Sequence, residues 1–167
     1  MLSSCFKLKE STIVVSELNN ATFSLLDGTY IEIIENQSFY TLADILCVNF
    51  QQKTTEYIKK GDTITSQLKM HSPSRLFINI HKNDSLIYSD IILGELKNNY
   101  FYLDKQKYND TSEGVIIFYQ EKNKSRLGIL PNGDLTIDHI NRFNIRLLYL
   151  PIDREDIYFK NKVYKRL

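Results

Sequence analysis

Residues 114–150 constrain the fold more than any other part of the chain. This stretch contains four short runs of apolar and β-branched residues joined by three polar connections, and the runs span residues 115–119, 127–130, 135–137 and 145–150. Tight connections can join antiparallel strands, whereas parallel neighbours need a crossover of a dozen residues or more. The stretch therefore predicts four strands of an antiparallel meander, with turns at residues 121–125, 131–134 and 141–144.

The strongest hairpin signal is the run Pro131-Asn132-Gly133-Asp134. Proline fixes φ near the value that a type I turn needs, and Asn and Gly tolerate a positive φ. Two turns fit this run. One is a type I turn with Gly133 in a G1 bulge, and the other is a two-residue type I′ turn at Asn132-Gly133.

The rest of the chain repeats this pattern. Further strand-like runs cover residues 11–16, 21–26, 29–34, 63–70, 75–81, 86–93, 100–103 and 157–167. Residues 104–113 read as a polar loop and residues 151–156 as an interruption. About ten strands at this spacing predict an all-β fold, a single antiparallel meander that closes into a barrel or a partly open barrel. We assign residues 1–26 to an N-terminal segment with one or two short strands and residues 27–167 to one β-barrel-like domain.

One short helix interrupts the strand pattern. Thr41 suits an N-cap, and Asp44 lies at the N3 position of a capping box. Apolar residues recur after Thr41 at helical spacing, namely Leu42, Ile45, Leu46 and Phe50.

The bulk composition narrows the classes of partner. The 167 residues carry a net charge of +1, from 21 Lys and Arg against 20 Asp and Glu, which argues against a broad electrostatic surface for nucleic acid. Cys5 and Cys47 are the only cysteines, so the sequence implies no disulfide framework. No run of 18 apolar residues exists, so no transmembrane segment is expected.

The sequence shows no reactive constellation. His71, His81 and His139 lack the spacing of a metal motif, and nucleophile and phosphate-loop signatures are absent. We therefore predict neither enzyme activity nor a cofactor. His139 alternates with the apolar Ile137, which favours a core or rim histidine.

The remaining charged residues are interpreted as solvent-facing. The late acids fit turns or exposed strand positions, and they are Asp134, Asp138, Asp153, Glu155 and Asp156. Three arginines lie on predicted strands, and they are Arg126, Arg146 and Arg166. An arginine pointing into a barrel would need a partner, because burying an unpaired charge is costly. We expect them on the outer wall, since arginine is rarely buried.

The start of the chain resembles a bacterial lipobox, Leu2-Ser3-Ser4-Cys5, in which Cys5 would carry the lipid. The basic and apolar regions that precede a lipobox do not precede it in this sequence. A truncated start would place the protein in the cell envelope on a lipid anchor, and otherwise a cytoplasmic location is expected.

A small set of residues links the chain to a known group. Gly28-Thr29-Tyr30 begins a strand, a short helix and a meander follow, and Arg166 lies near the end of the last strand. This plan resembles the calycins, the group of lipocalins and fatty-acid-binding proteins. The resemblance implies that Gly28 and Tyr30 stand where the family has Gly-x-Trp, and that Arg166 closes over this aromatic ring at the barrel base. Tyrosine replaces the family's tryptophan, and its second Thr-Asp-Tyr signature is missing.

Two functional hypotheses follow. Together with the lipobox-like start, the plan resembles small lipocalin-like lipoproteins of bacterial envelopes, which implies a non-catalytic domain with a small apolar ligand in its barrel. The alternative is an intracellular protein-interaction module, such as a toxin-immunity protein that presents exposed Tyr and Arg side chains. An enzyme ranks third.

Overall fold

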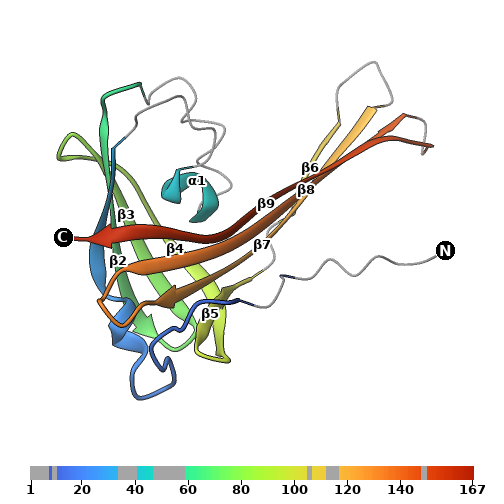
Figure 1. Cartoon of the computed structure of the whole chain (residues 1–167). Coiled ribbons are helices and arrows are strands. Elements are labelled where there is room, and N and C mark those ends of the chain that lie inside the picture. Colours follow the sequence, from blue (N-terminus) through green and yellow to red (C-terminus); the bar gives the residue numbers. More distant parts are fainter. Residues whose placement is uncertain are drawn as a thin grey trace.

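The computed structural model describes residue 8 and residues 11–33, 41–46, 59–104, 107–111, 117–147 and 150–167. In this part of the chain a 3-10 turn, a short helix and nine strands follow one another (Figure 1). The two helical elements are η1 (Phe23–Leu26) and α1 (Leu42–Leu46). The strands are β1 (Gly28–Ile33), β2 (Thr63–Ser72), β3 (Arg75–Lys82), β4 (Ser85–Lys97), β5 (Tyr100–Leu103), β6 (Lys107–Thr111), β7 (Ile117–Ile129), β8 (Leu135–Leu147) and β9 (Leu150–Arg166).

The sheet closes on itself. Its order is β5-β4-β3-β2-β1-β9-β8-β7-β6, and β5 also pairs with β7. Every pairing is antiparallel. Eight strands therefore form a closed barrel and β6 extends it beside β7, so the all-β prediction with one short helix is confirmed.

Strands β5 and β6 act as one interrupted strand along β7. Phe101 of β5 lies opposite Leu127, and Lys107 of β6 lies opposite Lys122 further along β7. Only β5 also pairs with β4, so it seals the barrel, and β6 continues past the seal. The predicted loop at residues 104–113 is wrong where β6 lies.

Strands β7, β8 and β9 are longer than predicted and run together away from β2–β4, past the helix α1 (Figure 1). The turns predicted at residues 121–125 and 141–144, and the interruption at 151–156, are wrong because all three segments lie inside these strands. Polar residues there face polar partners across the sheet. Asn123 lies opposite Asn141, and Arg142 donates two hydrogen bonds of 2.7 and 2.8 Å to the Asp156 carboxylate.

The tight turns follow the sequence signals. At the central hairpin Gly133 has φ of 90°, its N–H donates to the Leu130 carbonyl at 2.9 Å, and Leu130 N–H donates to the Asp134 carbonyl at 2.8 Å. This is the type I turn with a G1 bulge, one of the two predicted alternatives. Positive φ angles at Asn83-Asp84 and Asn98-Asn99 make the two-residue turns between β3 and β4 and between β4 and β5.

Helix α1 confirms the predicted capping box. The Thr41 N–H donates to Asp44 Oδ2 at 2.7 Å, and the Asp44 N–H donates back to Thr41 Oγ1 at 3.2 Å. Leu42 N–H donates to the Glu32 carboxylate on β1 at 3.0 Å. All five helical residues are buried, and α1 lies between β2–β4 and β9 (Figure 1). Cys47 and Phe50 lie outside the described residues.

The N-terminal segment differs from its prediction. Residues 11–16 and 21–26 are not strands, and the second run contains η1. Ser16 N–H donates to the Ile129 carbonyl at 2.7 Å, and Ser11 Oγ donates to Asn161 Oδ1 at 3.0 Å. The segment therefore contacts β7 and β9 without forming a strand of its own.

The core fills the barrel from every side. The inward positions of β2 and β3 alternate with exposed ones, as the strand period of two requires. Fully buried side chains line the centre, and they include Tyr30, Ile64, Leu68, Leu76, Ile78, Ile80, Phe101, Leu127, Leu135 and Ile137.

Candidate functional site

Strands β3 and β4 carry most of the large apolar side chains that are exposed in the described part of the chain, and the outward faces of β2, β3 and β4 together form an outer wall. Strand alternation turns one set of residues into the core and leaves the other set to solvent. The large apolar side chains exposed on β3 and β4 are Phe77, Leu86, Ile87, Ile91 and Leu93, with exposed fractions from 38 to 57%. Ile87 lies at an irregularity of the β3–β4 pairing, and the other four lie on the outward face. Single exposed apolar residues are ordinary, whereas a group of them on one wall is a candidate contact surface.

The strand register makes part of this group contiguous. Phe77 lies directly opposite Ile91, and Leu93 follows Ile91 on the same face of β4. We name these three residues the apolar stripe. Side chains directly opposite each other on antiparallel strands are about 5 Å apart at Cβ, so the stripe presents one unbroken apolar surface.

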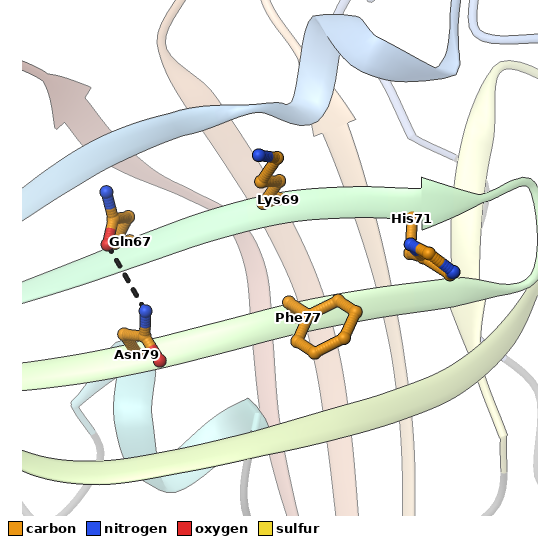
Figure 2. Close-up of a pocket in the computed structure, with 5 residues that line it drawn as sticks. All are labelled: Gln67, Lys69, His71, Phe77 and Asn79. Carbon is orange, nitrogen blue, oxygen red and sulfur yellow. Dashed lines mark hydrogen bonds between the residues drawn. The ribbon is translucent and has the colours of Figure 1, made fainter.

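A pocket of about 450 Å³ adjoins the stripe (Figure 2). Its lining side chains come from β2 and β3, and they are Gln67, Lys69, His71, Phe77 and Asn79. The His71 ring meets the Phe77 ring edge-on, with 5.6 Å between centroids. Along the other end of the pocket, Asn79 Nδ2 donates to Gln67 Oε1 at 3.3 Å, and Ser89 Oγ donates to Asn79 Oδ1 at 2.7 Å. The pocket is therefore lined by the rings of His71 and Phe77, by the Lys69 side chain, and by polar side chains that are hydrogen-bonded to one another.

The outer wall is also cationic. Lys69 lies opposite Phe77, and Arg75 lies opposite Leu93, so both cations flank the stripe. Neither forms a salt bridge with any residue that the structure describes. Of the outward positions on β2–β4, only Glu95 carries an acid, beyond the end of the stripe. The wall therefore presents positive charge around an apolar centre.

The edge of β4 beside this wall is capped by its own side chain. Over residues 85–93 β4 pairs with β3, and the described residues place no strand on its other side. Asp90 Oδ1 accepts the Ile91 N–H at 2.7 Å, and Asp90 Oδ2 accepts the Tyr88 hydroxyl at 2.7 Å. The Leu93 carbonyl accepts the backbone N–H of Asp104, which follows β5, so the backbone groups of Leu93 point away from β3. Residues two apart on a strand direct their backbone groups to the same side, so the Ile91 N–H also points away from β3. A carboxylate that accepts an otherwise unpaired N–H of an edge strand hinders the pairing of a further strand there.

The structure brings together the three residues that the calycin resemblance singled out. Tyr30 pairs with Arg166 across β1 and β9, and the Tyr30 hydroxyl donates to the Leu26 carbonyl at 3.3 Å. An added Cβ on Gly28 would lie 2.9 Å from Arg166 Nε and 3.1 Å from the Tyr30 hydroxyl oxygen, so the three residues lie close together. Burial raises the pKa of Tyr30 to about 12, which keeps the hydroxyl protonated. These contacts join β1 to β9 at the place that the resemblance assigns to the barrel base. Cys5, the predicted lipid-bearing residue, lies outside the described residues.

The described interior leaves little room for a ligand near this base. Tyr30, Leu68 and Phe101 have 0–1% of their surface exposed. A side chain without accessible area borders no space large enough for a water molecule. The predicted small apolar ligand would therefore have to bind away from these residues.

A buried polar cluster lies where β7 and β8 leave the barrel. Arg126 Nη2 and Nε contact Asp138 Oδ2 at 2.6 and 2.7 Å, and Arg126 Nη1 donates to the Tyr102 hydroxyl at 3.1 Å. Arg126 is 7% exposed, so the expectation that it faces water is wrong, and the same holds for Asp138 at 2%. Asp138 compensates the buried cation. Arg166 is exposed, as expected.

His139 is a core histidine, as predicted. It is 1% exposed, and its Nδ1 lies 2.7 Å from Ser125 Oγ. Burial lowers its pKa to about 4, so the ring is neutral at pH 7. The described residues contain no group of three His, Cys, Asp or Glu side chains that could hold a metal ion.

Sequence reasoning missed the outer wall. One signal was present, because residues 86–93 read Leu-Ile-Tyr-Ser-Asp-Ile-Ile-Leu, with apolar residues on both faces of the strand. A strand with one face in water ordinarily alternates. The second apolar face of β4 is the one that contributes Ile91 and Leu93 to the stripe.

Fold and surface together define a class, a closed eight-stranded antiparallel barrel with an apolar, cationic outer wall. The sequence matches no protein-family model, and no curated protein or solved structure matches it. None of the helices in the described residues has the length and apolar character needed to cross a bilayer.

Proposed function

We propose that this protein is a non-catalytic interaction module, in which a calycin-like barrel serves as scaffold and the outer wall of β2–β4 binds a protein partner. The observation that carries the proposal is the exposed apolar stripe, with Phe77, Ile91 and Leu93 side by side and 38 to 51% exposed. Desolvating such a surface on association is favourable, at about 25 cal/mol per Å² of apolar area. Aromatic and arginine side chains, here Phe77 and Arg75, are typical anchors of interfaces.

The calycin-like part of the proposal has separate support. The proximity of Gly28, Tyr30 and Arg166 supports the arrangement that the resemblance implies, and the closed antiparallel barrel and the short helix after β1 are further support. A small apolar ligand in the barrel stays a prediction. Extraction of the purified protein with organic solvent, followed by mass spectrometry, tests it.

The test places a photo-crosslinking amino acid at Ile91 in the cells that make the protein. We expect irradiation to give one discrete adduct with another protein. The same probe combined with Phe77→Ser should lose most of the adduct, because the substitution removes the aromatic part of the stripe and leaves the core untouched.

The matched control carries the probe at Lys165, an exposed residue of β9 that faces away from the core. It should give no adduct of that mass. Equal labelling from Ile91 and Lys165, no adduct from Ile91, or an adduct that survives Phe77→Ser would each contradict the proposal.

A further inference from the structure

We infer, on the basis of the proposed function, that the partner segment is an acidic and apolar polypeptide: its carboxylates meet Lys69 and Arg75 while its apolar side chains cover the stripe. The stripe alone would accept any apolar surface. The flanking cations restrict that choice, because an interface that covers them must supply negative charge or leave them poorly solvated.

Charge complementarity carries this step. Lys69 lies opposite Phe77 on β2, and Arg75 lies two residues before Phe77 on β3. Neither cation has an ion-pair partner among the residues that the structure describes. Elsewhere in the described chain a partly buried cation pairs with an acid, as Lys82 does with Asp62 at 2.8 Å. The chain as a whole is nearly neutral, so the positive charge of the wall is a local feature. Arginine can also hold a carboxylate through two parallel hydrogen bonds.

A second copy of the chain fits this wall less well. Two walls placed face to face would bring cations near cations, and the outward acid Glu95 lies beyond the stripe. Pairing through the β4 edge is hindered too, because Asp90 already occupies the Ile91 N–H. Both routes to a symmetric pair therefore carry an electrostatic or steric cost.

An anionic membrane surface also fits less well than a polypeptide. The row Gln67, Asn79 and Ser89 lies beside the stripe, held by hydrogen bonds of 3.3 and 2.7 Å. Inserting the stripe into lipid would bury the remaining donors and acceptors of this row among hydrocarbon chains, which costs free energy. The backbone of a polypeptide offers N–H and C=O groups that can satisfy them.

The experiment selects a random dodecapeptide display library on the immobilised full-length protein, with a counter-selection on Phe77→Ser. Selected peptides should combine Asp or Glu with aromatic or aliphatic residues. Their dissociation constants are measured by fluorescence anisotropy. We expect Lys69→Gln with Arg75→Gln to weaken binding about tenfold or more at low salt, and added salt to weaken binding to the unsubstituted chain more than to the variant.

Lys165→Gln is the matched control, since it removes one exposed cation outside the wall, and its affinity should stay within about twofold. Thermal unfolding followed by circular dichroism checks that each variant is folded. Peptides without acids whose binding ignores Lys69→Gln and Arg75→Gln would overturn this inference but leave the proposed function standing.

Two further outcomes would contradict the proposed function as well as the inference. Selection of no peptide that depends on Phe77 would count against both the inference and the proposed function. A second probe, vesicles of phosphatidylglycerol and phosphatidylcholine, tests whether the outer wall binds an anionic membrane. Vesicle binding that is lost in Phe77→Ser and in the double cation variant would replace a polypeptide partner with a lipid surface.

Discussion

At the scale of single residues, the central hairpin decides which buried groups meet. Residues equally distant from its turn face each other, so Arg126 lies opposite Asp138 and Ser125 lies opposite His139. Each pair then forms a direct contact of 2.6 to 2.7 Å. The sequence contains this signal, because the turn and therefore the register are readable. The polar run before Arg126 instead suggested a turn and hid the pairing.

Removing Asp138 should be costly. In Asp138→Ala the Arg126 cation stays buried and loses the carboxylate that compensates it, and we expect a loss of about 3–5 kcal/mol in the free energy of unfolding, measured by urea denaturation. Asp156→Ala breaks the more exposed pair of Asp156 with Arg142, and it should lower the free energy of unfolding by about 1 kcal/mol or less. Similar losses in the two variants would show that burial of the Arg126 pair contributes little.

His139 should make stability depend on pH. Its folded-state pKa of about 4 lies below the ordinary value of 6.5, so protonation favours the unfolded chain. The stabilising contribution is complete above pH 6.5 and is lost as the pH falls from 6.5 towards 4, by about 3 kcal/mol. Urea denaturation between pH 7 and 4 measures this loss.

The control for this loss replaces the histidine. His139→Gln should flatten the decline between pH 6.5 and 4, whereas the exposed His71→Gln should keep it. Asp62 titrates in a lower window, because hydrogen bonds from Lys82 and from the Lys59 backbone lower its pKa to about 2. An unchanged slope in His139→Gln would assign the decline to other groups.

At the scale of strands, pairing decides whether a polar run is a turn or a strand. Residues 121–125 and 141–144 have turn-like composition, yet they lie inside β7 and β8 and pair across the sheet, as Asn123 does with Asn141. Local composition cannot show this, because the partner lies about 20 residues away in the chain. Helix α1 is the opposite case, since its capping box is local and was predicted correctly.

The edge of β4 provides a prediction at this scale. Asp90→Ala removes the carboxylate that caps the Ile91 N–H and leaves an apolar edge strand open. We expect concentration-dependent self-association, measured by sedimentation velocity. Asp84→Ala, in the adjoining turn, is the control and should sediment like the unsubstituted chain. If both variants remain equally monomeric, the Asp90 cap does not protect the edge.

At the scale of the whole molecule, closure explains where the exposed surface lies. The β4–β5–β7 and β1–β9 pairings join the ends of the meander and fill the barrel with side chains. The apolar residues that do not fit inside, on the second face of β4 and at Phe77, remain on the outer wall. The barrel base and the outer wall lie on different strands, so scaffold and contact surface can change independently.

The sequence by itself determined the features that depend on near neighbours. These are the antiparallel class, the Pro131–Gly133 turn, the capped helix and the strand alternation, because each is governed by local backbone preferences or short connections. It also indicated Gly28, Tyr30 and Arg166, although only as a resemblance. Their contact required the pairing of the first and last strands.

Only the tertiary structure decided which faces are buried and how far the long strands extend. Closure of the barrel buried the Arg126–Asp138 pair and turned the apolar stripe outward, and pairing across the sheet extended β7–β9 through their polar runs. Each of these outcomes depends on contacts between residues far apart in the chain, and their free energy is gained only when the whole sheet has formed. A local pattern shows which faces a strand has, and the closed sheet decides which of them meets water.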